Sequence, residues 1–213
     1  VPTKEQIEQT LPLVNAKNVI IDSQNNQVYL KEQGMQIDLS SVINGYTTEL
    51  IKSTLKENGY SFFIINVGSN VYAEGTSKYY QAKKEKTYTE LTNPFDANKK
   101  YIKIKAENYF ITTVSKYQNY QEIDGIKYSS IINPETGYPT DNLIESITVL
   151  GNKGDVTDAM AYACFNMQWL RVLSWSIMIL HWKNSFHILS NIWNRSYHRQ
   201  QSEQVYRQSI QKN

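Results

Sequence analysis

The chain has 213 residues, of which 40% are hydrophobic and 20% charged, an ordinary composition for a globular protein with one well-buried core. The formal net charge of +2 is too small to indicate a nucleic acid or a membrane surface as a partner. A single cysteine, Cys164, excludes an internal disulfide framework, and its apolar helical neighbours indicate a buried structural thiol rather than a nucleophile.

Hydrophobic spacing in the first 60 residues predicts helices and a hairpin. Asn25 and Asn26 separate two short β-branched runs and tolerate the left-handed conformation of a tight turn. Apolar residues then recur at helical spacing up to Asn58 and Gly59, a usual helix stop. The expected elements are a helix at 2–11, hairpin strands at 19–21 and 28–30, a strand at 35–39 and a helix at 41–57.

The middle and later parts of the chain predict mainly strands. The apolar run 62–67, bounded by Gly68, is typical of a buried strand, whereas the Lys-rich stretch 76–100 shows no pattern and indicates a surface excursion with about one strand. Further strands are expected at 101–105, at 110–114, at 127–132 after an Asp124-Gly125 turn and at 143–150, with a final helix at 156–167.

These elements predict an α+β fold, with mixed β-sheets and a few packed helices, over residues 1–167. The composition changes abruptly after that point. Every Arg, Trp and His lies beyond residue 168, and the tail has six basic side chains against the single acid Glu203. We expect 168–213 to be a shifted-frame reading of the gene, an unrelated fusion or an unstructured tail. The alternative is an amphipathic segment that binds an interface or a partner, with apolar residues at Trp169, Val172, Leu173, Ile177 and Leu180.

Three junctions between elements could bind an anion. The segment Asp38–Tyr46 leads into a helix through Ser40, Ser41 and a glycine, so it could offer free N–H groups to a ligand, or Ser40 or Ser41 could simply be an N-cap. The turn at Asn66–Asn70 contains Gly68, which permits close approach of a ligand.

The third junction is the segment Asn133–Pro139, a rigid exposed loop in which Pro134, Gly137 and Pro139 fix the backbone. Such a loop can bind a ligand or be a plain structural turn.

Asp158 follows this loop, in the expected first turn of the last helix, where either Asp155 or Thr157 could be the N-cap. A carboxylate there could complete an octahedral Mg²⁺ site together with backbone carbonyls and substrate phosphates, or could serve the helix dipole alone. Residues 1–168 contain no His, which excludes a His-based triad in that part of the chain.

Taken together, four segments resemble motifs of the ApbE family, the FAD:protein FMN transferases. Ile37–Tyr46 resembles the family's D-L-G-G-x-A-K-G-Y, and Asn66–Gly75 resembles N-x-G-G-N-x-Y-x-x-G. Ile123–Pro139 is similar to D-G-K-R-Y-x-H-I-I-D-P-R-T-G-Y-P, and Thr157–Phe165 is similar to A-D-A-L-A-T-A-L-F. The four segments keep the family's order, and the first half of a typical member would lie before Val1.

This resemblance implies Mg²⁺-dependent transfer of FMN from FAD to a Thr or Ser hydroxyl of an acceptor protein, with release of AMP. It implies that Asp158 is catalytic and a metal ligand, with the carbonyl of Ile43 and the side chain of Tyr162 as further metal-side groups. The implied flavin-nucleotide contacts come from Ser41, Asn44, Asn66, Gly68, Thr113, Ser130, Thr136 and Gly137.

Several of these positions depart from the family motifs. Asn44 stands where the family has a lysine, Ser130 where it has a histidine, Tyr162 where it has a threonine and Lys116 where it has an acid. The alternatives are therefore a pseudoenzyme that binds a flavin nucleotide or a partner without transfer, and a non-functional fragment.

The resemblance also implies a bacterial protein of the cell envelope. Members of the family are membrane-associated lipoproteins, so the membrane would be reached only through a lipid anchor that this chain does not contain. No secretory signal is visible at Val1.

Overall fold

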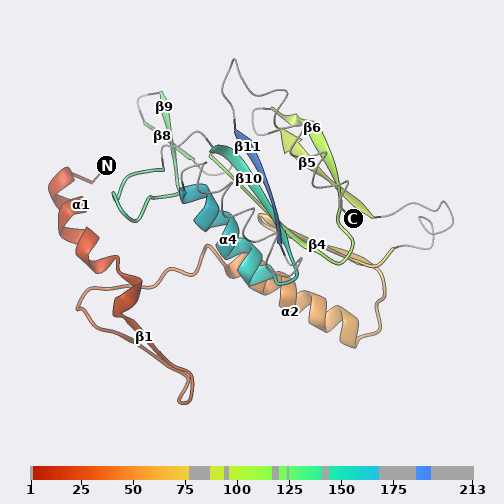
Figure 1. The fold of residues 1–213 in the computed structure, drawn as a ribbon, viewed down its shortest axis with the longest axis horizontal. Coiled ribbons are helices and arrows are strands. Elements are labelled where there is room, and N and C mark those ends of the chain that lie inside the picture. Colours follow the sequence, from red (N-terminus) through yellow and green to blue (C-terminus); the bar gives the residue numbers. More distant parts are fainter. Residues whose placement is uncertain are drawn as a thin grey trace.

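A five-stranded antiparallel sheet, covered on one face by two helices, forms the centre of the fold (Figure 1). The computed structural model describes residues 2–76, 87–93, 96–116, 120–123, 125–140, 144–167 and 186–192. The strand order is β11-β10-β7-β4-β3, with β3 at Phe63–Val67, β4 at Asn70–Glu74, β7 at Phe110–Ser115, β10 at Ile144–Gly151 and β11 at Phe186–Ile192. The covering helices are α2 at Ile43–Glu57 and α4 at Gly154–Asn166. The expected α+β class is confirmed.

An N-terminal arm precedes the sheet and extends away from it (Figure 1). Helix α1 begins with a capping box in which Thr3 and Gln6 bond each other's backbone N–H groups. Asn26, at φ 53°, provides the left-handed turn of the hairpin, as expected. The elements of the arm are α1 at Lys4–Thr10, two short 3₁₀ helices at Leu11–Leu13 and Ala16–Asn18, and strands β1 at Val19–Asp22 and β2 at Gln27–Leu30.

The prediction of a strand at 35–39 was wrong. The segment is mostly exposed and has no described partner strand, so its backbone groups form no ladder. Helix α2 then begins at Ile43 rather than at Ser41.

Two hairpins extend from the main sheet. The stretch 76–100 holds more strand than its polar composition suggested, because β5 at Tyr88–Asn93 pairs with a long β6 at Asp96–Lys105. The second hairpin pairs β8 at Tyr120–Ile123 with β9 at Ile126–Ser129. A hairpin was expected here, but its second strand ends at Ser129 rather than at residue 132, and Asp124 of its turn lies outside the described residues.

The main core lies between the sheet and α4. It is a cluster of apolar side chains from β7, β10 and α4, comprising Val114, Ile144, Ile147, Val149, Ala161, Cys164 and Phe165. A second cluster on the opposite face joins Ile111 and Leu150 to Ala73 and Ala106. Strand β10 is therefore buried on both faces, and both sides of the sheet are fixed in position.

The two edges of the sheet differ from expectation. Strand β3 was expected to be buried, but it is an edge strand in which Ile65 is buried and Ile64 is 57% exposed. At the other edge, β11 belongs to the compositionally distinct segment and pairs with β10. The apolar positions proposed for an amphipathic segment, 169–180, lie outside the described residues.

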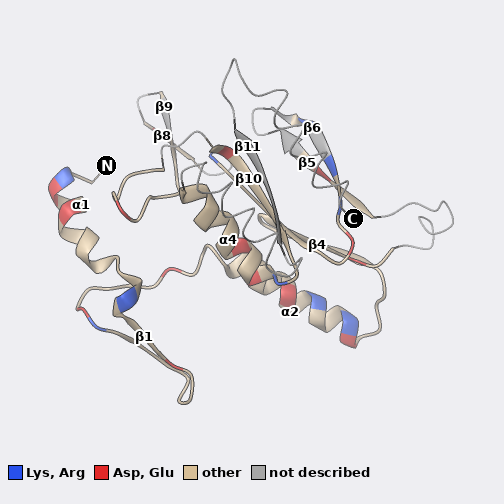
Figure 2. Ribbon diagram, viewed as in Figure 1, with Lys and Arg blue, Asp and Glu red and all other residues tan. Residues whose placement is uncertain are grey.

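Charged side chains of both signs are interspersed along α2 (Figure 2), in keeping with the small net charge. Within the described ranges, no helix combines the length and the hydrophobicity needed to cross a bilayer.

Candidate functional site

Asp158 is the most deeply buried acid of the candidate site, at 1% exposure. It was expected in the first turn of its helix, but α4 begins at Gly154 and places Asp158 in the second turn. Its position is therefore not explained by the dipole of its own helix, which acts mainly within the first turn. Its carboxylate instead bonds to neighbouring elements.

Three donors from three different elements converge on the Asp158 carboxylate. The backbone N–H of Gly45 donates to Oδ2 at 2.6 Å. Oδ1 accepts from Asn70 Nδ2 at 3.0 Å and from Thr112 Oγ1 at 2.6 Å. Asn70 and Thr112 face each other across β4 and β7, and Asn70 Nδ2 also donates to Thr112 Oγ1 at 2.8 Å. Asp158 therefore ties both helices to the centre of the sheet.

The N-termini of α2 and α4 cross in direct backbone contact. A Cβ atom added to Gly45 would lie 2.0 Å from the carbonyl oxygen of Gly154, and one added to Gly154 would lie 2.3 Å from that of Gly45. The N-cap residues, Val42 and Lys153, make no side-chain cap. The predicted N-caps were therefore wrong, whether at Ser40 or Ser41 for α2 or at Asp155 or Thr157 for α4. Each helix is instead capped by a side chain of the other. Asp158 of α4 accepts from the Gly45 N–H, and Glu49 Oε1 of α2 accepts from the Gly154 N–H at 2.7 Å.

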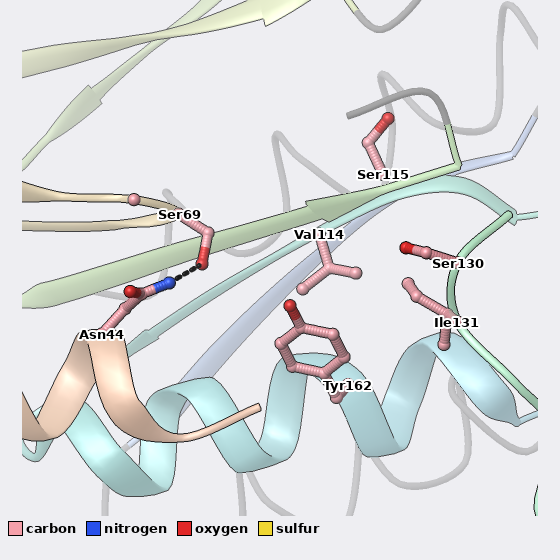
Figure 3. Close-up of a pocket in the computed structure, with 8 residues that line it drawn as sticks. Asn44, Ser69, Val114, Ser115, Ser130, Ile131 and Tyr162 are labelled. Carbon is pink, nitrogen blue, oxygen red and sulfur yellow. Dashed lines mark hydrogen bonds between the residues drawn. The ribbon is translucent and has the colours of Figure 1, made fainter. Parts of the chain in front are cut away.

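A cavity of about 310 Å³ opens beside this crossing (Figure 3). Asn44 of α2 lies on one side and donates to Ser69 Oγ at 3.4 Å, while Tyr162 of α4 points its hydroxyl into the space beneath Val114. The lining residues are Asn44, Gly68, Ser69, Val114, Ser115, Ser130, Ile131 and Tyr162. The volume lies at the lower end of the range for small-molecule sites, and hydroxyl and amide groups dominate the lining.

Gly68 is needed for this arrangement. Its φ of +55° is left-handed, and a Cβ there would lie 2.5 Å from the Asn44 amide nitrogen. The turn between β3 and β4 therefore presents its backbone directly to the Asn44 side chain.

Tyr162 remains protonated in this setting. Burial raises the pKa of its phenol, and the charges of Asp158 and Asp38 raise it further. The pKa of exposed Asp38 is lowered because the Ser40 N–H donates to its carboxylate at 2.8 Å. The cavity wall thus presents a neutral hydroxyl close to two acids.

Four of the residues expected to meet a flavin nucleotide or its metal line the cavity together. They are Asn44, Gly68, Ser130 and Tyr162, with Asp158 buried next to them. Besides Asp158, six expected residues are not among the lining residues, namely Ser41, Ile43, Asn66, Thr113, Thr136 and Gly137. Asn66 is exposed on β3, and Thr113 Oγ1 lies 2.9 Å from Thr148 Oγ1 across the sheet.

The loop containing Thr136 and Gly137 packs against α1. Gly137 has φ +74°, and a Cβ on it would lie 2.4 Å from Ile7 Cγ2 and 3.5 Å from Leu11 Cδ2. The Asn133 carbonyl accepts the Gly137 N–H at 2.8 Å, which closes the turn. The segment is thus a hydrogen-bonded turn, and its described contact is with the N-terminal arm.

Several contributors to the site were not predicted. Asn70 belonged to the candidate turn Asn66–Asn70, but it begins β4 and its hydrogen bond to Asp158 was not expected. Thr112 was not a candidate, and it lies on the face of β7 that also carries Phe110 and Val114. The period of two along β7 could have revealed Thr112 as a core-facing polar residue, which requires a buried partner. Glu49 carried no comparable signal, since its partner Gly154 lies 105 positions away.

The donor set around Asp158 fits one Mg²⁺ contact. A carboxylate offers about four lone-pair positions, and three are already used, which leaves one on Oδ2. The neighbouring Asn70 Oδ1 is buried and accepts no hydrogen bond from the described residues. These residues hold no cluster of three His, Cys, Asp or Glu suited to a metal. Proteins also hold Mg²⁺ through one carboxylate together with substrate phosphates, and the free lone pair of Asp158 Oδ2 is compatible with one such contact.

Comparisons with known proteins point to one family. A model of the ApbE family matches residues 1–177. The chain belongs to the ApbE family. The FAD:protein FMN transferase of Klebsiella pneumoniae (strain 342) is 29% identical over 166 residues, covering 76% of this chain and 49% of that protein. The FAD:protein FMN transferase of Escherichia coli (strain K12) is 25% identical over 162 residues, covering 75% of this chain and 45% of that protein. This ApbE chain thus spans about half the length of the curated relatives it matches.

Solved ApbE structures share the fold. The ApbE protein of Thermotoga maritima aligns with a TM-score of 0.73 at 25% identity, over 90% of this chain and 60% of its own. The flavin transferase ApbE of Vibrio cholerae aligns with a TM-score of 0.75 at 21% identity, over 92% of this chain and 59% of its own. The sequence resemblance and the α+β fold class are therefore confirmed.

Proposed function

We propose that this ApbE chain transfers FMN from FAD to a Thr or Ser hydroxyl of an acceptor protein in a Mg²⁺-dependent reaction. The proposal rests on the cavity between Asn44 and Tyr162. This cavity adjoins the buried carboxylate of Asp158, which has one lone pair that accepts no hydrogen bond from the described residues. Membership of a family whose curated relatives are FAD:protein FMN transferases supports this choice of reaction.

The chain's own residues supply positioning for phosphates. The Asn44 amide and the hydroxyls of Ser69, Ser130 and Tyr162 are donors that suit phosphate oxygens. The N-terminus of α2 adds partial positive charge on the same side. Asp158 would hold Mg²⁺, which when bound neutralises charge on the pyrophosphate. We further propose that the backbone carbonyl of Ile43 lies on the metal side.

The proposed transfer breaks the pyrophosphate of FAD. The hydroxyl oxygen of the acceptor attacks the phosphorus on the FMN side, the hydroxyl proton is lost to solvent, and AMP leaves with the other phosphate. Positioning and charge neutralisation supply most of the rate in such a reaction. The remaining expected contacts, from Ser41, Asn66, Thr113, Thr136 and Gly137, would reach parts of FAD outside this cavity.

The domain boundary and cellular location are also proposals. We propose that 1–167 is the ApbE-like domain and that 168–213 has a different coding origin, which the other two reading frames of the gene would reveal. A different coding origin for 168–213 must be consistent with two observations. The family match extends to residue 177, and β11 pairs with β10. We propose a location in the bacterial cell envelope.

A second candidate function is flavin-nucleotide binding without transfer. Asn44 is neutral where the family motif has lysine, and the Tyr162 phenol is a bulkier and weaker metal ligand than the threonine of the motif. Both changes reduce charge neutralisation at the phosphates.

One experiment distinguishes these functions. The purified chain is incubated with FAD, Mg²⁺ and an acceptor protein carrying a flavinylation motif, and the acceptor is analysed by intact mass. Covalent FMN on the acceptor together with released AMP supports the transferase. Saturable FAD binding without transfer supports the binding protein, and the absence of both contradicts each of them.

A further inference from the structure

We propose that Glu49 is a positioning residue for the cavity. It acts through the reciprocal capping pair, defined as the Glu49–Gly154 and Asp158–Gly45 hydrogen bonds. The inference relies on the proposed function only for the identity of the ligand. Glu49 lies one helical turn beyond Gly45 on α2, and Asp158 lies one turn beyond Gly154 on α4. Each acid thus reaches back to the start of the other helix.

The two caps cannot be separated geometrically. The glycines that donate to them are in backbone contact, so a shift of either helix that lengthens one hydrogen bond also moves the other. Neither N-cap residue, Val42 or Lys153, compensates with a side-chain cap, and the Asp155 carboxylate in α4 accepts the Val156 N–H at 2.7 Å rather than that of Gly154. Because helix ends without a cap are less stable, loss of one acceptor should loosen both ends.

The crossing sets the geometry of the cavity. Asn44 directly precedes Gly45, and its side chain is held between Gly68 and Ser69. Tyr162 lies one turn beyond Asp158 on α4 and forms the facing wall (Figure 3). The distance between these walls therefore depends on the reciprocal capping pair, although Glu49 is not a lining residue.

Amide hydrogen exchange tests this coupling in the ligand-free chain. We expect Glu49→Ala to accelerate exchange of the Gly154 N–H and also, by about tenfold, that of the Gly45 N–H, which Glu49 does not touch. Glu49→Gln keeps an oxygen acceptor and should restore most of the protection. Glu57→Ala, an exposed change on the same helix, is the matched control. Acceleration at Gly154 alone would overturn the proposal, because it would show that the two caps act independently.

FAD binding provides the second readout. Glu49→Ala should weaken FAD binding about tenfold, with Glu49→Gln close to wild type and Glu57→Ala unchanged. Unchanged affinity in Glu49→Ala contradicts a positioning role. If the wild-type chain binds no FAD, the proposed function fails, and the exchange of Gly45 alone then decides whether the capping pair is coupled.

Discussion

The carboxylate of Asp158 and the backbone N–H of Gly45 lie 113 positions apart in the sequence and 2.6 Å apart in the fold. This hydrogen bond links the start of α2 to the second turn of α4, and the same carboxylate reaches β4 and β7 through Asn70 and Thr112. The residue expected to hold a metal ion is thus also the point at which both helices are fixed to the sheet.

Asp158→Asn should therefore destabilise the fold as well as impair any activity. An amide group cannot accept from all three donors, so one N–H would meet another donor in a buried site. We expect the free energy of unfolding, measured by urea denaturation, to fall by about 2–4 kcal/mol. Asp155→Asn, in the first turn of the same helix, should cost less than about 1 kcal/mol. Equal effects of the two changes would contradict a central structural role for Asp158.

Gly45→Ala should be among the most damaging single-methyl additions in the described part of the chain. The new Cβ would lie 2.0 Å from the Gly154 carbonyl oxygen, so the two helices must separate. We expect a loss of more than about 3 kcal/mol in unfolding free energy. Gly59→Ala is the control: its φ is +83° but no atom lies within 4 Å of its Cβ position, so only backbone strain of about 1 kcal/mol applies. A tolerated Gly45→Ala would show that the close crossing is wrong.

Asn44→Lys should strengthen FAD binding. The substitution adds a cation beside the cavity, where it can meet phosphate oxygens. We expect about a tenfold lower Kd at low salt, with the gain shrinking as ionic strength rises. Asn58→Lys adds the same charge at the other end of α2 and should leave the affinity unchanged. A similar gain from both variants would indicate non-specific attraction.

Cys164 should make the fold sensitive to alkaline pH. Burial raises the pKa of its thiol from 9.0 to about 11, so the unfolded chain loses this proton at lower pH than the folded chain. The related stability is complete below pH 9 and is lost as the pH rises toward 11, by about 2–3 kcal/mol. Cys164→Ala should lower stability at neutral pH but decline less between pH 9 and 11. Parallel pH profiles for the two proteins would contradict this prediction.

The strands and helices with strong periodicity could be predicted from the sequence. The hairpin around Asn26, the helix ending near Asn58 and the strand from Ile144 each carry a local pattern that survives in the fold. The family motifs placed Asn44, Ser130 and Tyr162 in one predicted site, and these three residues line the same cavity.

The errors arose where distant contacts override local signals. Ser40 and Ser41 are good N-cap residues, yet α2 begins at Ile43 because the crossing with α4 supplies Asp158 as the acceptor. Similarly, the apolar run of β3 looked buried, but its position at the sheet edge exposes Ile64. Neither capping partners 113 residues apart nor strand order is visible in a short window of sequence.

The proposed function requires that the cavity between Asn44 and Tyr162 receives the pyrophosphate of FAD. Calorimetric titration of the wild-type chain with FAD, with and without Mg²⁺ and in the presence of ADP or riboflavin as competitor, tests it directly. We expect saturable FAD binding that requires Mg²⁺ and is competed by ADP but not by riboflavin. Absence of FAD binding, or Mg²⁺-independent binding that riboflavin competes as well as ADP does, would contradict it.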